Sequence, residues 1–83
     1  MPLERPEPEP ARLLAALDEW VAGEATPGAT MQSLKRGVLD ELVAASDNDE
    51  LKQAWDEWER GRATPGDTLQ RIEQAGVRAL LQS

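Results

Sequence analysis

Apolar residues recur at helical spacing in four stretches of the chain. On a helical wheel of 100° per residue, one face of the first stretch carries Leu13, Ala16, Leu17, Trp20 and Val21, and one face of the third carries Leu51, Ala54, Trp55 and Trp58. The second and fourth stretches place apolar residues at matching intervals between 31 and 43 and between 69 and 81. The pattern predicts helices over residues 10–22, 27–45, 48–60 and 65–82.

These stretches form an internal repeat with an offset of 38 residues. The segment LLAALDEWVAGEATPGATMQSL (13–34) aligns without gaps on LKQAWDEWERGRATPGDTLQRI (51–72), with 12 identities in 22 positions. Two motifs carry the identity, Asp-Glu-Trp and Gly-x-Ala-Thr-Pro-Gly-x-Thr. The repeat indicates that one helical unit is present twice.

Gly23 and Gly61 follow the last apolar position of the first and third stretches. Glycine adopts a left-handed backbone most easily and is common directly after a helix. We therefore expect the first helix of each copy to end at these glycines.

The start of the second helix in each copy has two interpretations. In the favoured one, Thr26 and Thr64 are N-caps and Pro27 and Pro65 occupy the first helical position. In the other, the Pro-Gly pairs, which include Gly28 and Gly66, form type II turns, and Thr30 and Thr68 are the caps. In both, the Thr-Pro-Gly element has a structural role.

A polar link at 46–50 separates the copies, and Asp47 with Glu50 has capping-box spacing. Short connections favour neighbouring helices that reverse direction. We expect an all-α fold of four helices, as two tandem hairpins (10–45 and 48–83) packed with approximate two-fold symmetry in a single domain. Residues 1–9, rich in Pro and Glu, are expected to form a disordered arm.

Composition narrows the chemistry. The 83 residues include no Cys and no His, so an ordinary zinc site, an Fe–S cluster and a thiol nucleophile are excluded. We expect no cofactor, no metal and no enzyme activity, because the remaining proton-transfer groups form no evident buried cluster. No apolar run reaches the roughly 18 residues that cross a membrane, and a cytoplasmic location is expected.

The three Trp residues are the aromatic residues of the chain. Trp20 and Trp58 occupy equivalent positions, and their expected role is to fill the core. Trp55 corresponds to Leu17 in the first copy, which makes it the best Trp candidate for a partly exposed interface anchor.

Differences between the copies suggest further surface features. Leu14 and Val21 are replaced by Lys52 and Glu59, so the first copy has the wider apolar stripe. Either a partner covers Leu14 and Val21 or uneven packing buries them. Gly76 stands where the first copy has Val38, and a close approach between helices is expected there.

The leading functional hypothesis is a small acidic, non-catalytic protein–protein interaction module that acts as an adaptor or regulatory subunit and can form a homodimer through Leu14 and Val21. An alternative is an antitoxin-like or DNA-mimic inhibitor of a basic partner, because the net charge is -7. A second alternative is a helix-turn-helix regulator that contacts phosphates through Arg71 and Arg78. Nucleic acid is a poor match for 16 acidic and 9 basic residues with no basic stripe.

Overall fold

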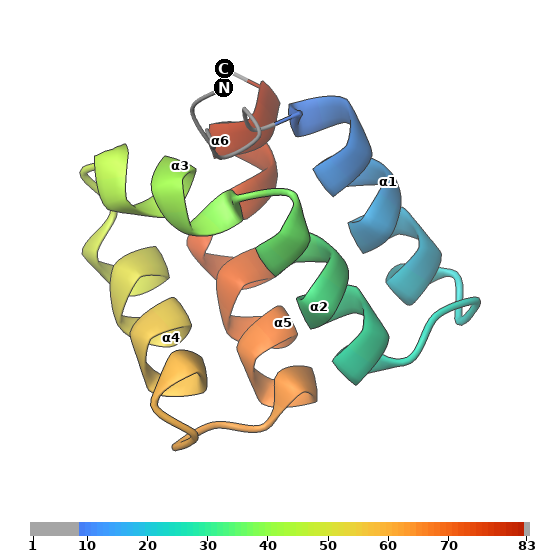
Figure 1. Ribbon diagram of the computed structural model, residues 1–83. Coiled ribbons are helices and arrows are strands. Elements are labelled where there is room, and N and C mark those ends of the chain that lie inside the picture. Colours follow the sequence, from blue (N-terminus) through green and yellow to red (C-terminus); the bar gives the residue numbers. More distant parts are fainter. Residues whose placement is uncertain (1–8, 83) are drawn as a thin grey trace, which may run out of the picture.

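The computed structural model describes residues 9–82, and every regular element in this part of the chain is a helix (Figure 1). The helices are α1 (Pro10–Val21), α2 (Pro27–Arg36), α3 (Leu39–Ala45), α4 (Asp49–Glu59), α5 (Pro65–Ala75) and α6 (Val77–Gln82). The predicted all-α class is confirmed. Almost all of the predicted arm, residues 1–8, lies outside the described residues.

The predicted count of four helices is wrong, because residues 9–82 form six. The expected helix over 27–45 is divided at Val38, and the expected helix over 65–82 is divided at Gly76. Both residues have a left-handed backbone, with φ of 59° at Val38 and 96° at Gly76. One residue in this conformation ends a right-handed helix and redirects the chain. The apolar pattern continues across each break because both pieces face the same core.

Gly76 does not mark a close approach between helices, as the sequence suggested. A Cβ atom built on this residue would have no atom of a non-neighbouring residue within 4 Å. The glycine instead provides the positive φ that the break requires. Val38 adopts the same region at a steric cost that Gly76 avoids.

The favoured start of the second helix in each copy is confirmed. Thr26 and Thr64 are the N-caps, and each side-chain oxygen accepts a hydrogen bond of 3.2 Å from the amide three residues later. Pro27 and Pro65 follow as the first helical residues, where the missing amide hydrogen has no cost.

The alternative with type II turns is wrong for the same segments. Gly28 and Gly66 lie inside the first helical turn. The hydroxyls of Thr30 and Thr68 are buried and donate to the carbonyl oxygens four residues earlier, at 2.9 and 2.8 Å. These two threonines are therefore internal helix residues and not caps.

The predicted ends of the first helix in each copy are also confirmed. Gly23 and Gly61 have φ of 78° and 74°. After α1, the amide of Glu24 donates to the carbonyl of Glu19 at 2.9 Å, and the amide of Gly23 donates to that of Trp20 at 3.0 Å. These two bonds form a Schellman motif, and the equivalent bonds follow α4.

The N-cap of α4 is Asn48, so the capping box predicted from Asp47 is wrong. The Asn48 Oδ1 atom accepts from the Leu51 amide at 3.2 Å, while its Nδ2 atom donates to the carbonyl of Ala75 at 2.6 Å. Asn48 thus caps α4 and also ties its start to the end of α5.

The central pair of helices is α2 and α5, with α1 beside α2 and α4 beside α5 (Figure 1). The short helix α3 packs on α4, and α6 packs on α1. One hydrophobic cluster contains residues from all six helices: Leu13, Leu17, Met31, Leu34, Leu39, Val43, Leu51, Ala54, Trp55, Leu69, Ile72, Val77 and Leu81. The two halves therefore share one interior.

Candidate functional site

The surface positions predicted on α1 differ in exposure. Val21 is 63% exposed and is the one large apolar side chain that is exposed in residues 9–82. Leu14 is half-buried and packs against the core cluster. Uneven packing thus partly buries Leu14, whereas Val21 remains exposed.

Trp55 is a core residue with 4% of its surface exposed, so the expectation of a partly exposed anchor is wrong. Its ring centroid lies 5.1 Å from that of Trp58, at an interplanar angle of 53°. Trp58 and Trp20 are half-buried and pack against the core. On α2, the Lys35 ammonium lies 5.7 Å from the Trp58 ring centroid, within reach of a cation–π interaction.

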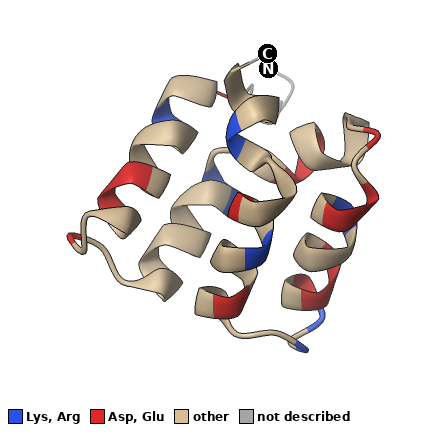
Figure 2. Ribbon diagram, turned by 180° about the vertical axis from the view of Figure 1, so that it is seen from behind, with Lys and Arg blue, Asp and Glu red and all other residues tan. Residues whose placement is uncertain are grey.

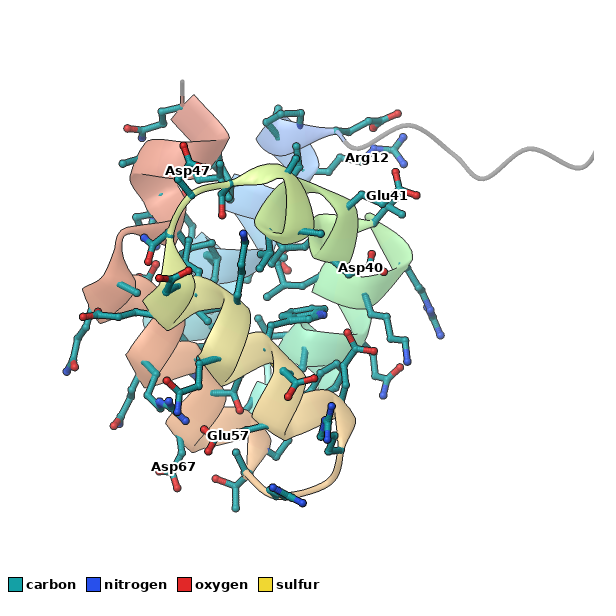
Figure 3. All side chains as sticks on the ribbon, turned by 90° about the vertical axis from the view of Figure 1, so that its left-hand side faces the viewer. Arg12, Asp40, Glu41, Asp47, Glu57 and Asp67 are labelled. Atoms are coloured by element: carbon teal, nitrogen blue, oxygen red, sulfur yellow. The ribbon has the colours of Figure 1, made fainter. Side chains whose placement is uncertain are left out.

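A groove of about 520 Å³ lies between α3 and α4, on the side of the molecule that Figure 3 shows. We call it the α3–α4 groove, and its lining residues are Asp40, Val43, Ala44, Lys52, Trp55, Asp56 and Glu59. Its apolar surface comes from one aromatic and two aliphatic side chains. Its charged residues are three acids and one lysine, so the groove carries net negative charge.

Trp55 has an unusual polar group for a core residue. Its indole Nε1 atom is buried and has no hydrogen-bond acceptor among residues 9–82. A buried donor without an acceptor costs about 1–3 kcal/mol. At the equivalent position of the first copy, Leu17 is fully buried and has no polar side-chain atom. The unsatisfied donor therefore distinguishes Trp55 from Leu17, the residue 38 positions earlier in the sequence.

The contact between α1 and α6, which we call the α1–α6 seam, carries an ion-pair network centred on Arg78. The Arg78 Nη1 atom lies 2.7 Å from Asp18 Oδ1 on α1, and its Nε atom lies 3.0 Å from each carboxylate oxygen of Glu73 on α5. The hydrogen bonds to Asp18 and Glu73 raise the pKa of the Arg78 guanidinium. This arginine joins the last helix to the first.

Three other arginines, Arg12, Arg60 and Arg71, also have acidic partners. Arg71, one of the two residues suggested to contact phosphates, pairs with Glu57 on α4. On the face that Figure 2 shows, Lys and Arg are interspersed with Asp and Glu and do not gather in one stripe. This distribution gives no support to a phosphate-binding surface on α5 and α6.

The sequence pointed to part of the α3–α4 groove and missed the rest. It marked Trp55, Lys52 and Glu59 as differences between the copies, but not as neighbours in one site. It did not mark Asp40. The available signal was the change of charge between Asp40 and the residue 38 positions later, Arg78.

Comparisons with protein-family models, with curated proteins and with solved structures gave no match to this chain. Within residues 9–82, no group of three or more acidic side chains is arranged to hold a metal ion. None of the helices in the same range has the length and apolarity needed to cross a membrane.

Proposed function

We propose that this protein is a small, non-catalytic protein–protein interaction module whose partner docks in the α3–α4 groove. The main observation in support is that the groove combines three acids with three apolar residues, one of which is Trp55, whose buried indole has an unsatisfied donor. Interfaces typically combine an apolar centre, often aromatic, with a polar rim.

We also propose that the protein consists of two equivalent three-helix units, related by an approximate two-fold axis through the α2–α5 contact. The supporting observation is the set of contacts between helices. Exchange of α1 with α4, α2 with α5 and α3 with α6 leaves the α2–α5 contact unchanged and converts every other principal contact into another member of the set. Under this exchange the α3–α4 contact corresponds to the α1–α6 seam.

The α1 edge is the competing docking surface and the basis for a homodimer. The exposed Val21 supports this surface, but Leu14 is half-buried beside it. A single exposed valine provides little of the buried area that a stable interface requires. We therefore favour the α3–α4 groove as the docking surface. Because the groove is acidic, we expect its partner to be basic, as in the inhibitor hypothesis.

Photo-crosslinking at equivalent positions distinguishes the two surfaces. A photoreactive phenylalanine derivative replaces Lys52 in the α3–α4 groove or Leu14 on α1 in the full chain, expressed in its native host. We expect a defined heterologous protein adduct from position 52 and little adduct from position 14. Circular dichroism of both purified variants checks that the fold is retained.

The remaining outcomes are equally informative. A protein adduct from position 14 alone would place the interface on the α1 edge, and a self-adduct there would indicate the homodimer. No protein adduct at either position, with both variants folded, would contradict the proposed function.

A further inference from the structure

The seven residues of the α3–α4 groove have counterparts 38 positions away on α1 and α6. Asp40, Val43 and Ala44 correspond to Arg78, Leu81 and Gln82, whereas Lys52, Trp55, Asp56 and Glu59 correspond to Leu14, Leu17, Asp18 and Val21. The whole groove therefore corresponds to the α1–α6 seam. The seam therefore provides a comparison in which the residue that corresponds to Asp40 is an arginine, Arg78.

Asp18 and Asp56 are the acids that the two places share, but they have different partners. Asp18 binds Arg78, which reaches it from another helix at 2.7 Å. Asp56 pairs with Arg60 of its own helix at 3.0 Å. The short helix α3 presents Asp40 where α6 presents Arg78, so it supplies acid in place of a guanidinium.

The groove is chemically suited to a cation from outside. Its three acids and one lysine attract a positive group, and low-dielectric walls focus that attraction. The exposed side chain of Ala44, together with the edges of Val43 and Trp55 that reach the groove, can cover the methylene stem of an arginine.

We propose that the α3–α4 groove binds a basic segment of a partner protein by accepting an arginine side chain beside Asp40, Asp56 and Glu59, in the role that Arg78 has in the α1–α6 seam. This inference rests on the proposed function and names the chemistry of its partner. The guanidinium binds the acidic rim through charge-assisted hydrogen bonds, which are stronger than neutral ones.

A matched pair of peptides tests the choice of arginine. The probe is a short fluorescein-labelled peptide with one central arginine flanked by leucines, and its control has citrulline, which is neutral and nearly isosteric, in place of arginine. Fluorescence anisotropy with the full chain measures both affinities. We expect the arginine peptide to bind about tenfold more tightly, and this difference to shrink between about 50 and about 300 mM NaCl as screening increases.

Variants of the protein test the location. Glu59→Gln and the double variant Asp40→Asn/Glu59→Gln should lower the affinity for the arginine peptide progressively, by about tenfold in the double variant. Asp18→Asn, in the α1–α6 seam, is the matched control and should leave this affinity unchanged. Circular dichroism confirms that each variant is folded.

Three results would overturn the inference. The first is equal affinity for the arginine and citrulline peptides. The second is that free arginine amide competes as strongly as the unlabelled peptide. The third is that Asp18→Asn loses as much affinity as the folded double variant. If the citrulline peptide binds equally well and position 52 still crosslinks to a partner, the interaction module stands and the arginine inference fails. If neither peptide binds and no crosslink forms, the proposed function fails as well.

Discussion

The α1–α6 seam and the α3–α4 groove are formed by segments that lie 38 residues apart in the sequence, but the two places differ in charge. In the seam, Arg78 connects three helices through Asp18 and Glu73. In the groove, Asp40 lies 38 positions before Arg78 in the sequence, and Asp56 pairs with Arg60 on its own helix. The charge differs at three pairs of residues, Asp40 and Arg78, Lys52 and Leu14, and Glu59 and Val21, and the groove is the more acidic of the two places.

A second difference between the groove and the seam concerns the buried residues Trp55 and Leu17. Leu17 and Trp55 are both buried, but only the tryptophan brings a polar atom into the interior. Its indole donor has no acceptor within residues 9–82, at an expected cost in stability. The groove thus differs from the seam both in the charge of its lining and in the polarity of the buried residue beneath it.

The largest expected effect on stability comes from substitution of Trp55, the buried aromatic residue of the α3–α4 groove. Trp55→Ala should lower the free energy of unfolding by about 3–5 kcal/mol, because a large buried ring is replaced by a cavity. Trp55→Leu, which introduces the residue found at the equivalent position, should cost less because more of the volume is filled and the unsatisfied donor is removed. Urea unfolding followed by far-ultraviolet circular dichroism measures both. A Trp55→Ala protein as stable as the parent would contradict the assignment of Trp55 to the core.

Substitutions at the two helix breaks, Val38 before α3 and Gly76 before α6, should have the next largest effects on stability. Gly76→Val places at the second break the residue that occupies the first, and should destabilise the protein by about 1–2 kcal/mol because valine resists a positive φ. A Cβ atom at Gly76 meets no atom of a non-neighbouring residue within 4 Å, so the expected cost arises from the backbone conformation.

Val38→Gly is the reciprocal change. It relieves the same backbone cost but removes a buried side chain worth about 1.5–3 kcal/mol, so a net loss smaller than that burial term is expected. Thermal unfolding of both variants provides the comparison. A neutral Gly76→Val would show that the left-handed conformation at this break is not required.

The ion pair of the α1–α6 seam should contribute less. Arg78→Gln should lower the free energy of unfolding by about 0.5–1 kcal/mol, because the pairs with Asp18 and Glu73 are partly exposed and share one arginine. Denaturant unfolding at low and high salt measures the loss, and added salt should reduce it. A loss that does not change with salt would indicate that packing of the arginine stem dominates.

The smallest expected effect concerns the intrahelical pair of the groove. Arg60→Gln removes an exposed bridge worth about 0.3–0.5 kcal/mol and releases Asp56 for an external cation. Stability should therefore hardly change, while affinity for the arginine peptide rises. Anisotropy titration of this variant beside the parent protein gives the result. Weaker binding by a folded Arg60→Gln protein would count against Asp56 as part of the cation site.

Local features of the fold could be predicted because their causes are local. The caps at Thr26 and Thr64 and the helix ends at Gly23 and Gly61 depend on residues within one turn of each terminus. The break at Val38 could not be predicted in this way, because valine disfavours the conformation that its surroundings impose.

The candidate site was only partly predictable for a different reason. Trp55 and the changes at positions 52 and 59 were visible as departures from the repeat, but the groove exists only where α3 packs on α4. The position of α3 follows from the unpredicted break before it. The sequence therefore does not show which residues lie near Asp40, and the role of Asp40 in the groove could not be predicted.

The difference between the two places can be measured within one molecule by nuclear magnetic resonance. The indole N–H signals of Trp55 and Trp20 report on the α3–α4 groove and on α1, and single Trp→Phe variants assign them. On titration with the arginine peptide, we expect a saturable shift of the Trp55 signal and little change at Trp20, and the citrulline peptide should need about tenfold higher concentration for half of that shift. A shift confined to Trp20, or half-saturation of the Trp55 shift at equal concentrations of the two peptides, would contradict the arginine inference.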